Sequence, residues 1–133
     1  MSEIAVVDAF LAALREEPSL AQIVHEGTVE DRPTRYVSVF TDGGLRGVES
    51  FTGPQQTALR TFVVHSVAAD PRKARQISQL VIDQVVDRVL VVDGRVCRRV
   101  QHEASEPARL DRDVDPPLFY GVDEFSVTSK PAT

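Results

Sequence analysis

The sequence predicts an α+β fold in which a mixed or antiparallel β-sheet of four to five strands packs with two α-helices. Two stretches carry apolar residues at helical spacing, and several others alternate apolar and polar residues between turn signals. The length of 133 residues suits one compact domain, expected to span residues 1–133. No apolar run is long enough to cross a bilayer, and no basic region precedes the N-terminal apolar residues. We therefore expect a soluble protein that is made in the cytoplasm and has no membrane partner.

The first element is expected to be an amphipathic helix over residues 4–14, because apolar residues recur there at helical spacing. Ser2 is placed to cap the start of this helix, and Pro18 to end it. Residues 20–24 can add a short helical turn before Gly27 breaks it.

The middle of the chain contains two predicted strands separated by a stretch rich in glycine. Residues 36–40, which read Tyr-Val-Ser-Val-Phe, predict a strand, and the turn signal Asp42-Gly43-Gly44 follows them. Residues 45–56 contain two further glycines, so a ragged edge strand and a long mobile loop both remain open there. Residues 59–69 predict a long strand with apolar residues on both faces, which favours a central place in the sheet.

The second predicted helix runs from about residue 71 to about residue 90. Asp70 is placed as its N-cap, with Pro71 at the first helical position. One side of this helix carries an apolar stripe made of Ala74, Ile77, Val81, Val85 and Val89. We expect the stripe to be buried against the sheet.

Two more strands are predicted after the turn at Asp93-Gly94. The first covers residues 95–103 and has a polar outer surface that carries three arginines. A polar loop with three prolines, Pro107, Pro116 and Pro117, is expected next. The last strand covers residues 118–127, and residues 128–133 are expected to form a frayed tail.

No pattern of residues predicts a catalytic, metal or cofactor site. The histidines form no closely spaced ligand pair, and Cys97, the only cysteine, excludes an internal disulfide. Asp111, Asp113 and Asp115 resemble the start of a calcium loop, but Pro116 stands where such a loop needs glycine. Neither a phosphate-binding glycine loop nor a nucleophile motif is present. We therefore predict no enzymatic activity, no metal and no cofactor.

The charge pattern predicts that this protein binds other proteins and does not bind DNA. The net charge of −5 provides no general attraction to nucleic acid. Three arginines, Arg95, Arg98 and Arg99, are the exception to this acidic character. These arginines either form a solvated strand face or bind carboxylates across a subunit interface. In the second interpretation their partner is a protein.

Several short stretches resemble the tail terminators of actinobacterial siphophages. They are residues 59–69, Asp70-Pro71-Arg72-Lys73-Ala74, the long helix, residues 91–97 and Pro116-Pro117-Leu118-Phe119-Tyr120. The resemblance covers about residues 34–128. Members of that family share a compact α+β fold, related to the tail terminator of phage lambda, and form hexameric rings that cap the tail tube, stop its growth and join it to the head connector.

The resemblance implies a virion structural protein of the tail or neck. Its partners are then other copies of itself, the tail tube protein and the head-tail connector protein, while DNA passes through the ring without specific binding. Residues 41–56 are a long excursion between strands, and such loops often contact a neighbour, here as an assembly loop. We therefore expect the subunit interface to include Asp42, Arg46, Glu49, Phe51, Arg95, Arg98 and Arg99.

Two alternatives remain open at this point. One is a different neck or tail-completion subunit of the same virion, distinguished by the end of the tail that it occupies. The other is a small ligand-binding or enzymatic α+β domain that uses His65 and its strand neighbours in a cleft.

Overall fold

The computed structural model describes residues 2–29, 33–41, 45–46, 57–114 and 116–132, which form two helices and eight strands. In chain order these are α1 (Ser2–Arg15), β1 (Val24–Glu26), β2 (Tyr36–Thr41), β3 (Leu45–Arg46), β4 (Ala58–Ala68), α2 (Pro71–Val85), β5 (Val89–Val92), β6 (Arg95–Arg99), β7 (Gln101–Asp111) and β8 (Leu118–Pro131). The α+β class is confirmed, but the prediction of four to five strands was wrong. None of the described helices has both the length and the hydrophobicity that a membrane span requires.

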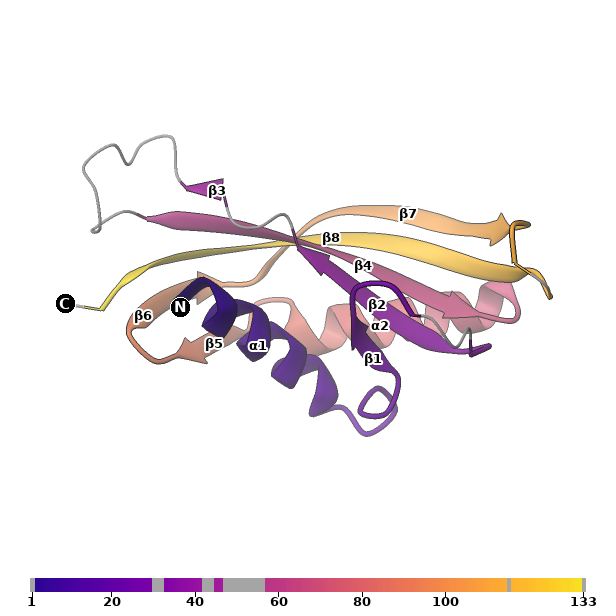
Figure 1. Ribbon diagram of the computed structural model, residues 1–133, viewed down its shortest axis with the longest axis horizontal. Coiled ribbons are helices and arrows are strands. Elements are labelled where there is room, and N and C mark those ends of the chain that lie inside the picture. The colour runs from indigo at the N-terminus through magenta and orange to yellow at the C-terminus, as the bar shows by residue number, and fades with distance from the viewer. Residues whose placement is uncertain (1, 30–32, 42–44, 47–56, 115, 133) are drawn as a thin grey trace.

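The described strands form one sheet in the order β1-β2-β4-β8-β6-β5, with β3 also paired to β4 and β7 also paired to β8. β1 and β2 run parallel, and the other described pairs are antiparallel. The sheet is thus mixed, as predicted. Both helices lie on the same side of it (Figure 1).

The long pair β4–β8 runs through the middle of the sheet (Figure 1). Its register continues from Ala58 opposite Ser129 to Ala68 opposite Phe119. β2 and β3 follow one another along the other edge of β4, and β7 and β6 do the same along the other edge of β8. The central position predicted for residues 59–69 is confirmed.

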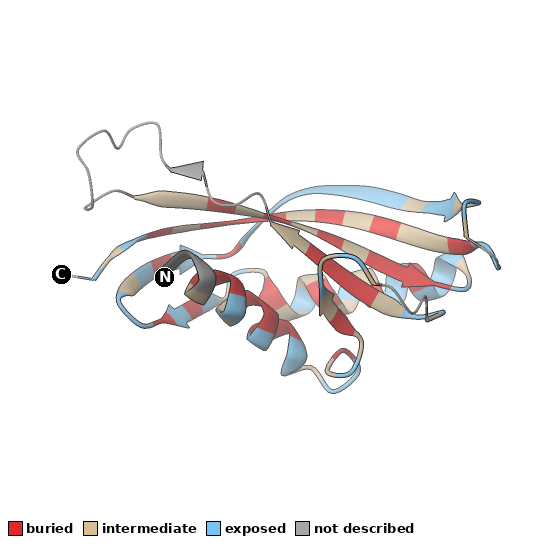
Figure 2. Ribbon diagram, viewed as in Figure 1, coloured by how far each residue is buried: buried red, intermediate tan, exposed pale blue. Residues whose placement is uncertain are grey.

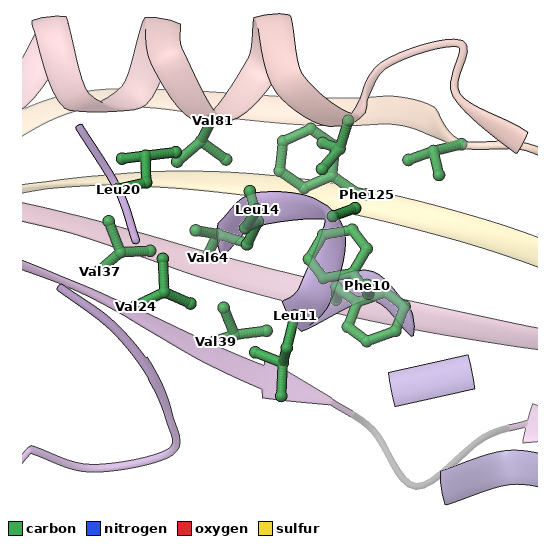
Figure 3. Close-up of a cluster of buried hydrophobic side chains, with 14 of the residues drawn as sticks. Phe10, Leu11, Leu14, Leu20, Val24, Val37, Val39, Val64, Val81 and Phe125 are labelled. Atoms are coloured by element: carbon green, nitrogen blue, oxygen red, sulfur yellow. The ribbon is translucent and has the colours of Figure 1, made fainter. Parts of the chain in front are cut away.

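The hydrophobic core lies between this sheet and the helices. Phe62 of β4 is directly opposite Phe125 of β8, and the ring of Phe10 in α1 stacks on Phe62 with ring centroids 4.0 Å apart. Because successive side chains of a strand point to opposite faces, the even-numbered residues of β4 and the odd-numbered residues of β8 share the helix-facing side. Buried segments on the facing sides of the helices and the sheet mark this core in Figure 2, and Figure 3 shows Phe10 and Phe125 among its aliphatic side chains.

α1 confirms the first predicted helix, with differences at its ends. Ser2, expected as the N-cap, is the first helical residue, and the helix ends at Arg15, before Pro18 is reached. Hydrogen-bonded turns follow, so the turn expected at residues 20–24 begins earlier. Val24 then starts β1, which was not predicted because three residues are too few to show an alternation.

The start of α2 agrees with the prediction and its end does not. The Asp70 carboxylate accepts a hydrogen bond from the backbone N–H of Lys73 at 2.8 Å, as an N-cap should. The helix stops at Val85, because Val86 is extended and Asp87 has a φ of 65°. Four residues of the predicted stripe, Ala74, Ile77, Val81 and Val85, are buried.

Val89, the fifth residue of the predicted stripe, is a correction. It lies in β5 and is 51% exposed. The run Val-Leu-Val-Val at residues 89–92 favours a strand through its β-branched side chains. Val100 fixes the start of this strand, because its carbonyl accepts from Asp87 N–H and its own N–H donates to the Arg88 carbonyl, both at 2.9 Å.

The segment predicted as one strand over residues 95–103 and a loop after it is instead β6 followed by β7. β7 runs through Pro107, where a loop was expected, and its register with β8 is irregular between Glu106 and Arg109. An edge strand tolerates proline at such an irregularity. No residue of β7 is buried, so its sequence lacks the alternation of apolar and polar residues that predicts a strand.

The structure also describes residues 128–131 and 45–46, for which the sequence made predictions. Residues 128–131, expected to be frayed, continue β8, in which Ser129 pairs with both Ala58 of β4 and Cys97 of β6. Residues 45–46 form the short strand β3 on β4, as the edge-strand alternative requires. The turn at 42–44 and the remainder of the predicted assembly loop, 47–56, lie outside the described residues.

Candidate assembly interface

The predicted interface residues of the loop are untested by the structure. Asp42, Glu49 and Phe51 lie outside the described residues, and Arg46 is placed only through its backbone in β3. These four residues stay predictions.

The three arginines of β6 have different surroundings. Arg95 turns onto β8, where its Nε and Nη2 donate to the Ser129 Oγ at 3.2 and 3.0 Å and Nη2 also donates to the Ser129 carbonyl at 3.0 Å. Arg99 Nη1 donates to the Asp87 carbonyl at 3.1 Å. Arg98 is exposed, and within the described part of the chain it makes no hydrogen bond or ion pair. Of the three, Arg98 is the one that makes no hydrogen bond or ion pair among the described residues, and the exposed Arg99 makes a single hydrogen bond.

An exposed apolar surface lies beside Arg98 on the β5–β6 hairpin. Val91 and Val96 are directly opposite each other and are 92% and 50% exposed. Val89, two residues before Val91 on β5, is 51% exposed, and the pairing of β5 with β6 is irregular between the two. We call Val89, Val91 and Val96 the valine patch. Leu90 and Val92 point the other way into the core, so the hairpin is apolar on both sides.

The side of the sheet that faces away from the helices is apolar near its centre. We call it the open face; its residues are Tyr36, Ser38 and Phe40 of β2, Leu59, Thr61, Val63, His65 and Val67 of β4, and Tyr120, Val122, Glu124, Ser126 and Thr128 of β8. Most of these side chains are partly exposed. A solvated face of an antiparallel sheet is normally polar, so this one is unusual.

Carboxylates border the apolar centre of the open face. Glu124 lies directly opposite Val63, and Glu106 of β7 lies opposite Val122. Glu103 of β7 accepts a hydrogen bond from the Ser126 hydroxyl. Among the residues that the structure describes, no cation is in ion-pair contact with Glu124.

His65 lies in the middle of the open face, between two aromatic rings. Its ring centroid is 5.1 Å from that of Phe40 and 5.7 Å from that of Tyr120. Burial lowers the pKa of His65, and the nearby Glu106 carboxylate opposes this shift to a smaller extent. A hollow that the structure describes lies elsewhere, beside β1, lined in part by Arg15, His25 and Arg35.

The lowered pKa of His65 predicts a loss of stability in mild acid. As the pH falls below about 6.5, the unfolded chain binds a proton at His65 that the folded protein resists, and the effect levels off below the folded pKa. Thermal unfolding midpoints should therefore fall less between about pH 7.5 and about pH 5 in His65→Gln than in the parent protein. An identical pH dependence in both proteins would show that His65 does not contribute. The difference between them removes the titrations that both share.

A polar cluster around the buried Asp123 side chain joins β7 and α2 to β8. Asp123 is fully buried; its Oδ1 lies 3.1 Å from His102 Nε2 and accepts a hydrogen bond of 2.7 Å from Ser105 Oγ. Its Oδ2 accepts from the Ser78 hydroxyl of α2. The His102 ring also stacks on Phe125, with centroids 5.1 Å apart. We call these four polar residues, Ser78, His102, Ser105 and Asp123, the Asp123 cluster.

The Asp123 cluster contains serine, histidine and aspartate but not the order that nucleophilic catalysis needs. A catalytic serine donates to the histidine, which in turn is oriented by the carboxylate. Here both serine hydroxyls bind the carboxylate directly. The arrangement gives the buried Asp123 side chain hydrogen-bond partners and fixes β7. No sequence pattern predicted it, because its partners lie 18, 21 and 45 positions from Asp123.

The described residues offer little for metal or thiol chemistry. Within them, no group of three or more His, Cys, Asp or Glu side chains is placed to hold a metal ion. Cys97 is buried on the helix-facing side of β6, and burial raises the pKa of its thiol, an effect that Arg95 only partly offsets. A thiol with a raised pKa is a poor nucleophile.

Comparison with solved structures matches the chain to a protein in the virion of a native gene transfer agent (GTA) particle. The two chains are 20% identical, and the match covers 95% of each with a TM-score of 0.73. No protein-family model matches the chain, and neither does any curated protein. The two proteins therefore share one fold over nearly their whole lengths.

Proposed function

We propose that this protein is a virion structural subunit, namely a tail terminator. In this role it forms a hexameric ring that caps the tail tube, ends its polymerisation and joins the tail to the head connector. The observation that carries the proposal is the fold shared with a chain of the GTA virion across 95% of both proteins. The sequence stretches that resemble tail terminators fall on β4, on α2, on β5 and β6, and on the start of β8.

The proposed role needs protein partners and no cofactor. Each subunit binds further copies of itself, the tail tube protein and the head-tail connector protein. Two different surfaces that meet between neighbours generate a ring when their rotation closes. DNA passes through the ring without specific binding, and the net charge of −5 keeps the ring from attracting phosphate generally.

The loop candidates remain part of this proposal. We assign residues 41–56 as an assembly loop in which Asp42, Arg46, Glu49 and Phe51 contact a neighbouring subunit. In β6, Arg98 has no bonded partner among the described residues, whereas Arg95 binds Ser129 and Arg99 binds the Asp87 carbonyl.

Imaging of the purified protein with tail tubes tests the proposed function. We expect negative-stain images of the mixture to show a six-fold ring at one end of each tube, and tubes polymerised in its presence to stop growing. A ring on the connector with none on the tube would indicate a different neck subunit. Protein that neither forms rings nor binds tubes would contradict the proposal.

A further inference from the structure

We propose that the valine patch of one subunit docks on the open face of a second copy of this chain, with Arg98 of the hairpin meeting Glu124 of the face. The inference rests on the proposed function, because it names a contact by which ring subunits hold one another. Four observations support it.

The first observation is that two of the edge strands, β7 and β5, differ in how they are protected. β7 carries charged residues, Pro107 and register irregularities along its edge, which are the features that prevent unwanted pairing with other chains. β5 ends the sheet order with four apolar residues, of which Val91 is 92% exposed. An unprotected apolar edge with a flanking arginine is typical of a surface that another protein covers.

The second observation is the composition of the open face. Neither described helix lies on it, as Figure 1 shows. Phe40 of β2 nevertheless lies opposite Val63 of β4, and Val122 of β8 lies diagonally from Val63, so three adjacent strands each place an apolar side chain there. A strip of this kind can receive the valine side chains of a second subunit, with water excluded from both surfaces on contact.

The third observation is charge complementarity between the two surfaces. Arg98 shares the outward side of β6 with Val96, and in the described residues it has no partner. Glu124 is half-buried beside Val63 and has no cation partner there either. A forked guanidinium that reaches this carboxylate in a partly desolvated interface forms a charge-assisted hydrogen bond.

The fourth observation is the position of the hairpin. The valine patch belongs to the same side of the sheet as the open face, since Val96 lies opposite Lys130 and Glu124 lies farther along β8. In Figure 1 the β5–β6 hairpin lies beside α1, at the same end of the molecule as the N-terminus. A patch at one end of a subunit can contact a neighbour, and the neighbour's patch can contact the next subunit, so the contact repeats.

Charge reversal of both partners tests the contact in the full chain. Sedimentation over a series of concentrations should show that Arg98→Glu, Glu124→Arg and Val91→Asp each weaken self-association by about tenfold. The double variant Arg98→Glu with Glu124→Arg should recover most of the loss, because the ion pair is restored with its signs exchanged. Circular dichroism establishes that each variant is folded. If Glu124→Arg does not fold, Glu124→Gln removes the charge at nearly the same size.

Matched controls separate this contact from general effects of charge. Arg75→Glu makes the same change as Arg98→Glu on an exposed position of α2, away from both surfaces. Leu110→Asp puts aspartate on β7 in place of an exposed apolar residue that is outside the valine patch. Both controls should associate like the parent.

The outcomes distinguish the contact from the ring. Association of Val91→Asp at parental strength, or a double variant no better than its single parents, would overturn the contact even if rings form normally. Rescue by the double variant in complexes no larger than dimers would support the contact and contradict the ring. A parent protein that never self-associates would overturn both.

Discussion

Replacing Val81 by aspartate should bring the protein to the edge of unfolding. Val81 is fully buried on α2 and faces the sheet near Val64 and Leu14 (Figure 3). The substitution places an unpaired carboxylate in the core, at a cost of several kcal/mol from a total stability on the order of 5–15 kcal/mol. Urea denaturation followed by circular dichroism measures the effect.

The control for Val81→Asp is the same change at a 92% exposed valine, Val91→Asp. It should alter the free energy of unfolding by less than about 1 kcal/mol, when measured at a protein concentration that keeps subunits apart. Equal stability of the two variants would show that the wrong side of α2 has been assigned to the core.

Removing the carboxylate of Asp123 should have the second largest effect. Asp123→Ala leaves the Ser78 and Ser105 hydroxyls and the His102 imidazole without their shared partner. His102 and Ser105 are exposed and Ser78 is half-buried, so water can partly replace the lost carboxylate, and the free energy of unfolding should fall by about 1–3 kcal/mol. The loss should be local as well, because three of the four members of the Asp123 cluster connect β7 with β8.

Hydrogen exchange provides the readout for this local effect. In Asp123→Ala, the amides of residues 101–111 should exchange faster than those of β4, since the connection from β7 to α2 is gone. Glu124→Ala is the matched control, because Glu124 is the next residue of β8 and points to the open face. Uniformly faster exchange over the whole sheet, or an unchanged exchange rate in residues 101–111, would contradict a specific role of Asp123 in holding β7.

The elements that the sequence predicted well are those with a strong periodicity. α1, α2 and β4 each bury one side against the core, and their patterns record this directly. The β4 pattern had apolar residues on both faces, which correctly placed the strand in the middle of the sheet. The apolar residues on the second side of β4 belong to the open face. The sequence alone could not tell which of the two sides the helices cover.

The elements that were missed have little or no periodicity. β7 is exposed on both faces, so no alternation marks it, and β1 is only three residues long. The end of α2 was misplaced because Val89 happens to continue the helical stripe, whereas the left-handed backbone at Asp87 breaks the helix. That break depends on the backbone hydrogen bonds with Val100, which no local pattern records.

The candidate site was only partly predictable for the same reason. Charge and spacing indicated Arg95, Arg98 and Arg99 as candidate interface residues. The sequence could not show that Arg95 donates a hydrogen bond to Ser129. The Asp123 cluster assembles residues that are 18, 21 and 45 positions from Asp123. Such distances are set by the pairing of strands, and a single sequence does not display them.

The central place of β8 also determines when this protein can fold. β4 finds its main partner only in β8, and even the nearest pair, Ala68 and Phe119, is 51 positions apart in the sequence. Sheets built from such distant segments form slowly, because the entropy cost of closing a long loop comes before any stabilising contact between the strands. On the ribosome, β2 can pair with β4, and β5 with β6, before residues 118–131 emerge. β4, β6 and β7 can join one sheet only afterwards, because each of them pairs with β8.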